Sequence, residues 1–268
     1  MARYFEDFSG GQGGWSGWGY VNNKKEVAKS GNPGTGPLAV PIVDGALHCS
    51  SPWWVDYNHA PPGQPKVPGV RVKGSYLHLL ACLQCSPGPN SSTRPDIWEA
   101  GGKNNFVTGE FPKDWTDAKM TLRLRGQLDL RGARLGLLAQ ARVASVDRMV
   151  NSVLPFPSPI TADWEEQSVM LVPEDDAWQC LGSRVDRFET YGASPISEVL
   201  SDMNGNIILV LFHLDVVPAD MHAGRVPAGE LHTRRAGLDY PVDYSRLPEG
   251  HVEFDFISIE FPDVGSRL

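Results

Sequence analysis

Apolar and polar residues alternate over short stretches of this sequence, and the alternation predicts β-strands. In the segment 119–124, Met120, Leu122 and Leu124 are separated by polar residues. Such a period of two is typical of a strand with one face buried and the other in water. The segment 134–142 follows, and we expect it to pair with 119–124.

Other segments give further strands. The stretch 206–215 is apolar on both faces, which predicts a strand in the middle of a sheet. A short helix is expected at 194–200, where Pro195 occupies the first turn. Additional strands are expected at 3–8, 39–43, 46–49, 70–85, 166–173 and 251–261.

Glycine and proline, 28 and 22 residues, fall in clusters that predict loops. Residues 30–38 read as a loop, and longer insertions are expected near 51–69, 86–105 and 216–249. No internal repeat or linker divides the chain, so we expect a single domain over 1–268. The predicted fold is all-β: a two-sheet antiparallel jelly-roll sandwich with long loops and one or two short helices.

Composition narrows the classes of function. The chain has 268 residues, 41% hydrophobic, which is ordinary for a globular protein. Its formal net charge is −8 without a basic cluster, which disfavours nucleic acid as a partner. We expect no membrane span, because the sequence has no apolar stretch of about 18 residues. We expect no signal peptide, because the first residues are charged and lack an apolar segment. A cytoplasmic protein is expected, or an extracellular one whose leader is not part of this sequence.

Short motifs at both ends of the chain resemble a known superfamily. Phe-Glu-Asp-Phe at 5–8, followed by Gly13-Gly14-Trp15, resembles the opening of galactose-binding-like jelly rolls. These include several carbohydrate-binding-module families and the laminin IV domain. Segments 197–202 and 254–259 are similar to the laminin-IV-like pattern. A concanavalin-A-like sandwich of lectins and glucanases is the second resemblance.

The resemblance implies a structural calcium ion. In jelly-roll carbohydrate-binding modules the first and last strands pair, and calcium often lies there. Glu6 and Asp255 would be its ligands in this chain, since carboxylate oxygens suit Ca²⁺. The alternative interpretation is that both are ordinary surface carboxylates or caps of strand ends.

An aromatic cluster in a proline-rich loop is the main candidate for ligand binding. It contains Trp53, Trp54 and Tyr57. Flat aromatic rings bind the apolar faces of sugars, and polar neighbours such as Asp56 and His59 would bind hydroxyls. The alternative is that these rings close one end of the sandwich as packing.

Three more residues belong to the candidate binding set. Trp98, in the next predicted loop, could add to the same rim, or lie in a solvated turn. Arg123 and Arg125 alternate with buried residues of their strand and could bind an anionic sugar such as a uronate. The alternative is that both arginines pair with the carboxylates of this acidic chain.

Catalytic candidates are weaker. His213 and Asp215 share one face at the end of the predicted central strand, and His222 and His232 follow. Together they could bind a metal ion or act as acid and base, and His59 and Asp56 are the other candidates. The alternative interpretation is that His213 is a hydrogen-bonded, partly buried side chain without a catalytic role. Cys82 and Cys85 form an isolated C-x-x-C motif, which we interpret as buried thiols.

Two functions remain open. The first is a non-catalytic, lectin-like glycan-binding module that holds its ligand on the loop aromatics. The second is an enzyme, a lyase or hydrolase, acting on a carbohydrate or small polar substrate with Asp, His and Arg residues at one end or on the concave face of the sandwich. No standard catalytic motif is present in the sequence, and no organic cofactor is expected.

Overall fold

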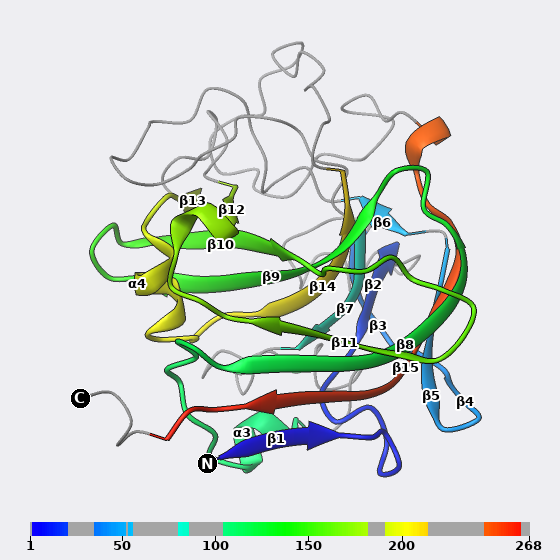
Figure 1. Ribbon diagram of the computed structural model, residues 1–268, viewed down its shortest axis with the longest axis horizontal. Helices are drawn as coiled ribbons and strands as arrows, with labels where there is room; N and C mark the ends of the chain where they lie inside the picture. The colour runs from blue at the N-terminus through cyan, green and yellow to red at the C-terminus, as the bar shows by residue number, and fades with distance from the viewer. Residues whose placement is uncertain are drawn as a thin grey trace.

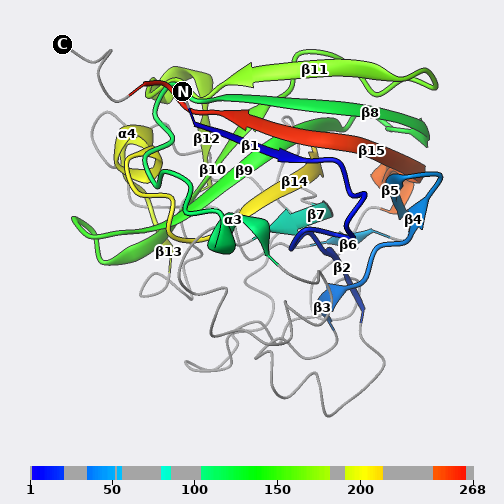
Figure 2. The same ribbon diagram turned by 90° about the horizontal axis from the view of Figure 1, so that it is seen from below.

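Two β-sheets face each other in the computed structural model (Figures 1 and 2). Figure 2 shows one sheet along the upper side and the other beneath it. The predicted two-sheet antiparallel sandwich is therefore confirmed. The structure describes residues 2–20, 35–51, 53–55, 80–85, 104–181, 191–213 and 244–263.

The first sheet, called sheet A, has six described strands in the order β11-β8-β15-β5-β4, with β1 also paired to β15. Every pair in it is antiparallel. The bounds are β11(Glu165–Met170), β8(Lys119–Asp129), β15(Glu249–Glu260), β5(Ala46–Ser50), β4(Ile42–Val43) and β1(Arg3–Glu6).

The second sheet, called sheet B, has seven described strands in the order β12-β10-β9-β14-β7-β6, with β13 also paired to β10. Only the β10–β13 pair among these is parallel. The bounds are β12(Gln179–Cys180), β10(Arg148–Pro155), β9(Arg134–Val143), β14(Ile207–Phe212), β7(Leu80–Cys85), β6(Trp54–Val55) and β13(Tyr191–Gly192).

Smaller elements complete the described part of the chain. A two-stranded sheet joins β2 to β3, and β3 lies where we expected only a loop. The helix predicted at 194–200 is present as α4. None of the described helices is long and apolar enough to cross a membrane. The bounds are β2(Gly17–Tyr20), β3(Thr35–Leu38), α3(Asn105–Thr108), α4(Ile196–Leu200), and the 3₁₀ turns η3(Asp175–Ala177) and η4(Tyr244–Arg246).

Strand β14 confirms the predicted central strand. It lies between β9 and β7 in sheet B and is buried along nearly its whole length. By contrast, the predicted pairing of 119–124 with 134–142 is wrong. Strand β9 is buried along most of its length and lies in sheet B between β10 and β14. Strand β8 keeps a polar face in solvent and pairs instead with β15 and β11.

Strand β15 connects the ends of the chain. One edge pairs with β8 along its length, while the other pairs first with β5 and then with β1. The register shifts between Phe254 and Phe256, so Asp255 is an extra residue in a β-bulge. The first and last strands therefore pair, as the resemblance to jelly rolls implies.

Aromatic side chains fill the core near the N-terminus. The rings of Tyr4 and Phe106 stack with centroids 3.7 Å apart, and Trp115 stacks on Phe106 at 5.7 Å. Trp15 Nε1 donates a hydrogen bond to the Tyr4 hydroxyl at 2.8 Å. Because the indole and phenol groups are buried, this bond removes the cost of burying both polar atoms.

Trp53 belongs to the same core, with only 6% of its surface exposed. Replacing it with alanine should lower the free energy of unfolding by about 3–5 kcal/mol, because burial is lost and a cavity remains. Chemical denaturation of Trp53→Ala measures this loss. The control is Met170→Ala on sheet A, which is 47% exposed and should change stability by less than about 1 kcal/mol. Equal, small effects of both changes would contradict a core role for Trp53.

Candidate functional site

A row of polar side chains crosses the outer face of sheet A. His48 on β5 lies directly opposite Glu253 on β15, and Glu253 lies opposite Arg125 on β8. Leu47 and Phe254, one position along their strands, are fully buried. Since successive residues of a strand point to opposite faces, the polar residues point away from the core.

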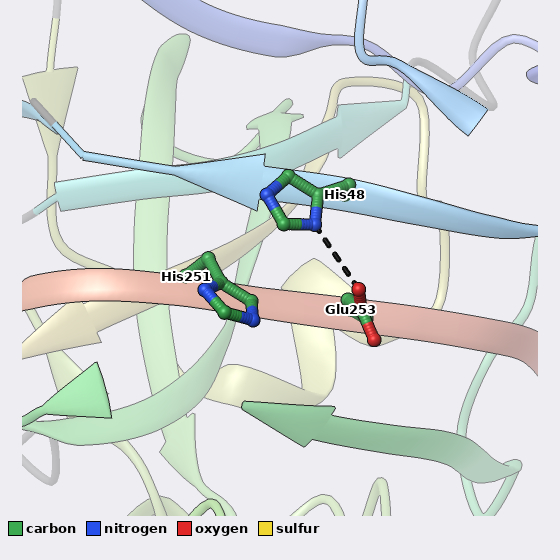
Figure 3. Close-up of side chains that lie close together, drawn as sticks. All are labelled: His48, His251 and Glu253. Carbon is green, nitrogen blue, oxygen red and sulfur yellow. Dashed lines mark hydrogen bonds and ion pairs between the residues drawn. The ribbon is translucent and has the colours of Figure 1, made fainter. Parts of the chain in front are cut away.

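The carboxylate of Glu253 lies between two basic groups. His48 Nδ1 donates a hydrogen bond to Glu253 Oε1 at 3.1 Å, and Arg125 Nε donates to Oε2 at 2.5 Å. His251 projects from the same face, and its ring stacks on that of His48 with centroids 4.6 Å apart. Figure 3 shows the two imidazoles side by side, one on each strand, with Glu253 beside them.

Two opposing effects set the pKa of Glu253. Burial raises it, because the side chain is only 10% exposed, but the hydrogen bonds and charges of Arg125 and His48 lower it by more. The net pKa lies below the usual value for glutamate. Glu253 is therefore a carboxylate at neutral pH, able to accept hydrogen bonds or to ligate a cation.

Trp164 extends the row towards β11. The Arg125 guanidinium lies 4.5 Å from the centre of the Trp164 ring, and that of Arg123 lies 5.4 Å from it. Arg123 Nη1 also donates to Asp255 Oδ2 at 2.5 Å. Both arginines are thus held between a carboxylate and an indole. These ion pairs agree with the alternative interpretation from the sequence, that both arginines pair with carboxylates of this acidic chain.

A small cavity of about 170 Å³ opens in this face. Its floor includes Gly126, whose N–H donates to the Thr161 carbonyl at 2.7 Å. A Cβ on Gly126 would lie 2.6 Å from the His251 carbonyl oxygen, so the loop and strands could not pack here around a larger residue. The lining residues are Arg125, Gly126, Gln127, Ala162, His251 and Glu253.

His48, His251 and Glu253 also form the group of described residues that could hold a metal ion. One potential ligand atom from each lies within 4.8 Å of the others. All three project from neighbouring strands inside a sheet, so their backbones are fixed by cross-strand hydrogen bonds. The group contains two imidazoles and one carboxylate.

The structure does not bring the two residues of the predicted calcium site together. Glu6 on β1 points into the sandwich, where it is 5% exposed, while Asp255 projects to the outer face beside Arg123. Asn105 Nδ2 and the Phe8 N–H donate to the Glu6 carboxylate at 2.5 and 3.1 Å. Calcium binding by this pair stays a prediction.

The aromatic loop is described only in part. Trp53 lines a cavity of about 150 Å³ together with Cys49 and Cys82, and its buried Nε1 has no hydrogen-bond partner among the described residues. Trp54 lies on β6. The other members of the candidate binding and catalytic sets, Asp56, Tyr57, His59, Trp98 and Asp215, lie outside the described residues, as do His222 and His232.

His213 lies at the end of β14 and is fully buried. Its Nε2 donates to the Arg246 carbonyl at 2.8 Å, and its Nδ1 lies 3.3 Å from the Arg246 guanidinium. The four cysteines are also buried, and none of them forms a disulfide. Burial raises the pKa of the Cys49 and Cys82 thiols, which keeps them protonated and unreactive.

Sequence reasoning missed His48, His251 and Glu253. Residues 251 and 253 are two apart in an alternating segment, so a shared face was readable. His48, however, is brought to Glu253 by pairing between strands 205 positions apart. Nothing local to either segment specifies that pairing.

Comparison with known proteins adds little. No family model matches the sequence, and no curated protein matches it. One solved chain with a similar structure comes from work on endo-acting O-glycanases that human gut bacteria express to initiate mucin breakdown. It has a TM-score of 0.35 and 10% identity, covering 97% of this chain and 99% of that chain. The likeness is distant, and the conclusions below rest on the site itself.

Two neighbouring acids near the N-terminus should respond to pH in opposite ways. Burial, and to a smaller degree Asp7, raises the pKa of Glu6, although Asn105 and the Phe8 N–H lower it. A raised folded-state pKa stabilises the fold below the unfolded value, about 4.3, and this stabilisation is lost as pH rises through the folded pKa. The unfolding free energy of the wild type should therefore fall relative to Glu6→Gln between about pH 4 and pH 7.

Asp7→Asn is the matched control. Ser9 donates two hydrogen bonds to the Asp7 carboxylate and lowers its pKa, so its contribution is present above the unfolded value and lost on acidification. Denaturation in calcium-free buffer across this pH range measures both. The same trend with pH for the two substitutions would contradict the inward placement of Glu6.

Proposed function

We propose that this protein is a non-catalytic glycan-binding module whose ligand rests on the outer face of sheet A. The observation that carries the proposal is the row of His48, Glu253 and Arg125, with Trp164 packed against Arg125. It combines donors, acceptors and an aromatic ring on one rigid surface. A few fixed polar groups beside an apolar wall are typical of sites for small polar ligands.

The pairing of charges favours neutral sugars. Arg123 and Arg125 are each bound to a carboxylate, so neither guanidinium presents an uncompensated positive charge. The row instead offers alternating donors and acceptors. A sugar hydroxyl is both a donor and an acceptor, so it can bind to such a row without leaving a buried charge unpaired. An acidic sugar would compete with Glu253 and Asp255 for the same arginines.

The size of the cavity indicates how much of the ligand is enclosed. At about 170 Å³ it is smaller than the roughly 300 Å³ at which enclosed ligand pockets begin. It can hold part of one sugar ring, while the rest of a chain would lie along the surface. The predicted loop aromatics Trp54, Tyr57 and Trp98 remain a proposed second contact for such a chain.

The alternative, a glycoside hydrolase or lyase, has weaker support at this site. A general acid needs a carboxyl group with a raised pKa, whereas that of Glu253 is lowered. Asp255 on the same face is held in an ion pair by Arg123. The lowered pKa of Glu253 suits hydrogen bonding to a ligand better than proton donation.

A screen against immobilised glycans, followed by titration with the best ligand, tests this proposal. Trp164→Ala and Arg125→Gln should each weaken binding by at least about 10-fold, equivalent to about 1.4 kcal/mol. The control is Arg142→Gln, because Arg142 pairs with Asp147 on an exposed part of sheet B. All titrations contain a metal chelator. Binding that is unaffected by both substitutions would move the site to the loops, and no binding to any glycan would contradict the function.

A further inference from the structure

We propose that His48, His251 and Glu253 bind a divalent transition-metal ion, with zinc as the best match. The potential ligand atoms lie within 4.8 Å of one another on the outer face of sheet A. This metal site shares His48, His251 and Glu253 with the proposed glycan surface, but it can be tested without any glycan, and it differs in ligands and position from the predicted calcium site.

The spacing of the ligand atoms is close to what zinc requires. With bonds of about 2.0–2.2 Å, tetrahedral geometry places neighbouring ligand atoms about 3.4 Å apart. His48 Nδ1 and Glu253 Oε1 are already 3.1 Å apart. A metal ion would replace the proton on His48 Nδ1, and rotation of the two stacked imidazoles would bring His251 into the same coordination shell.

The chemistry of the donors favours zinc over calcium. Two imidazoles and one carboxylate are the ligand set of many zinc sites that keep a fourth position open. Calcium instead requires six to eight oxygen ligands, and this group offers oxygen from one side chain only. Copper and nickel also bind imidazole. The order of affinity among these divalent metals is therefore set by their general preference for nitrogen ligands rather than by this fold.

The second oxygen of Glu253 is held in a way that supports ligation. Arg125 binds Oε2 from β8, while Oε1 faces His48 on β5, so the two oxygens have separate partners. A hydrogen bond to the far oxygen fixes the orientation of a ligating carboxylate. Arg125 also adds a positive charge nearby, so the open position should prefer water or an anionic oxygen. Both histidines are partly exposed, which leaves a path for the ion.

Zinc titration of the full chain tests the site, with a chromophoric chelator as competitor and no glycan present. The wild type should bind zinc, and His48→Gln and His251→Gln should each raise the Kd by at least about 10-fold. Zinc should also raise the Tm of the wild type more than that of either variant. Cobalt in place of zinc should give visible absorption bands that both variants lose.

Gln127→Ala is the control, since Gln127 lies opposite His251 on the same face but supplies no ligand. It should bind zinc as the wild type does. Circular dichroism of the variants confirms that they are folded, and glutamine in place of histidine keeps a polar side chain on the strand. Failure of the wild type to bind zinc, or equal binding by the double variant His48→Gln/His251→Gln, would overturn the proposal. Neither result bears on glycan binding by the wild type, which is measured with chelator present.

Discussion

The pairing of β15 with three other strands is the constraint on which the rest of the structure depends. One edge of β15 binds β8, and the other binds β5 and then β1. This single strand joins the two halves of sheet A, ties the two ends of the chain together and sets the register of His48 and Arg125 against Glu253. Its inner face supplies four buried core residues: Val252, Phe254, Ile257 and Ile259.

The outer face of the same strand has a different energetic balance. Glu253 is nearly buried, which is unfavourable for a charge, and His48 and Arg125 compensate for that cost from both sides. Removing one partner would leave the carboxylate partly unpaired in a poorly hydrated position. The row is therefore a structural network as well as the proposed binding surface. Its polar groups are held in place before any ligand arrives, which lowers the entropic cost of binding.

Glycan and metal would share His48 and Glu253 and would otherwise extend to opposite ends of this network. Trp164, Arg123 and Arg125 lie towards β11, whereas His48 and His251 lie towards β5. Glu253 stands between them and contacts both sides through its two oxygens. The two proposals can thus hold together or separately. A metal ion on the histidine side could bind an oxygen atom of the glycan without displacing the arginines.

The sequence by itself determined the class of fold and several of its elements. Local alternation and a doubly apolar segment identified β8, β14 and β15, and Pro195 marked the start of α4. These features are local, because a strand's period of two and a helix's first turn are encoded within a few residues. The sequence also placed Arg123 and Arg125 on a solvent face. It could not say that β9 leaves β8 for the other sheet.

Only the tertiary structure decided the site. His48 meets Glu253 across 205 positions of sequence, and Asp255 pairs with Arg123 on the outer face while Glu6 points inward. A shift of one residue in either register would send these side chains to the opposite face. Register between distant strands is set by how the whole core packs, not by the residues that happen to meet. For that reason the sequence shows His48, His251 and Glu253 as separate residues but does not show that they are neighbours.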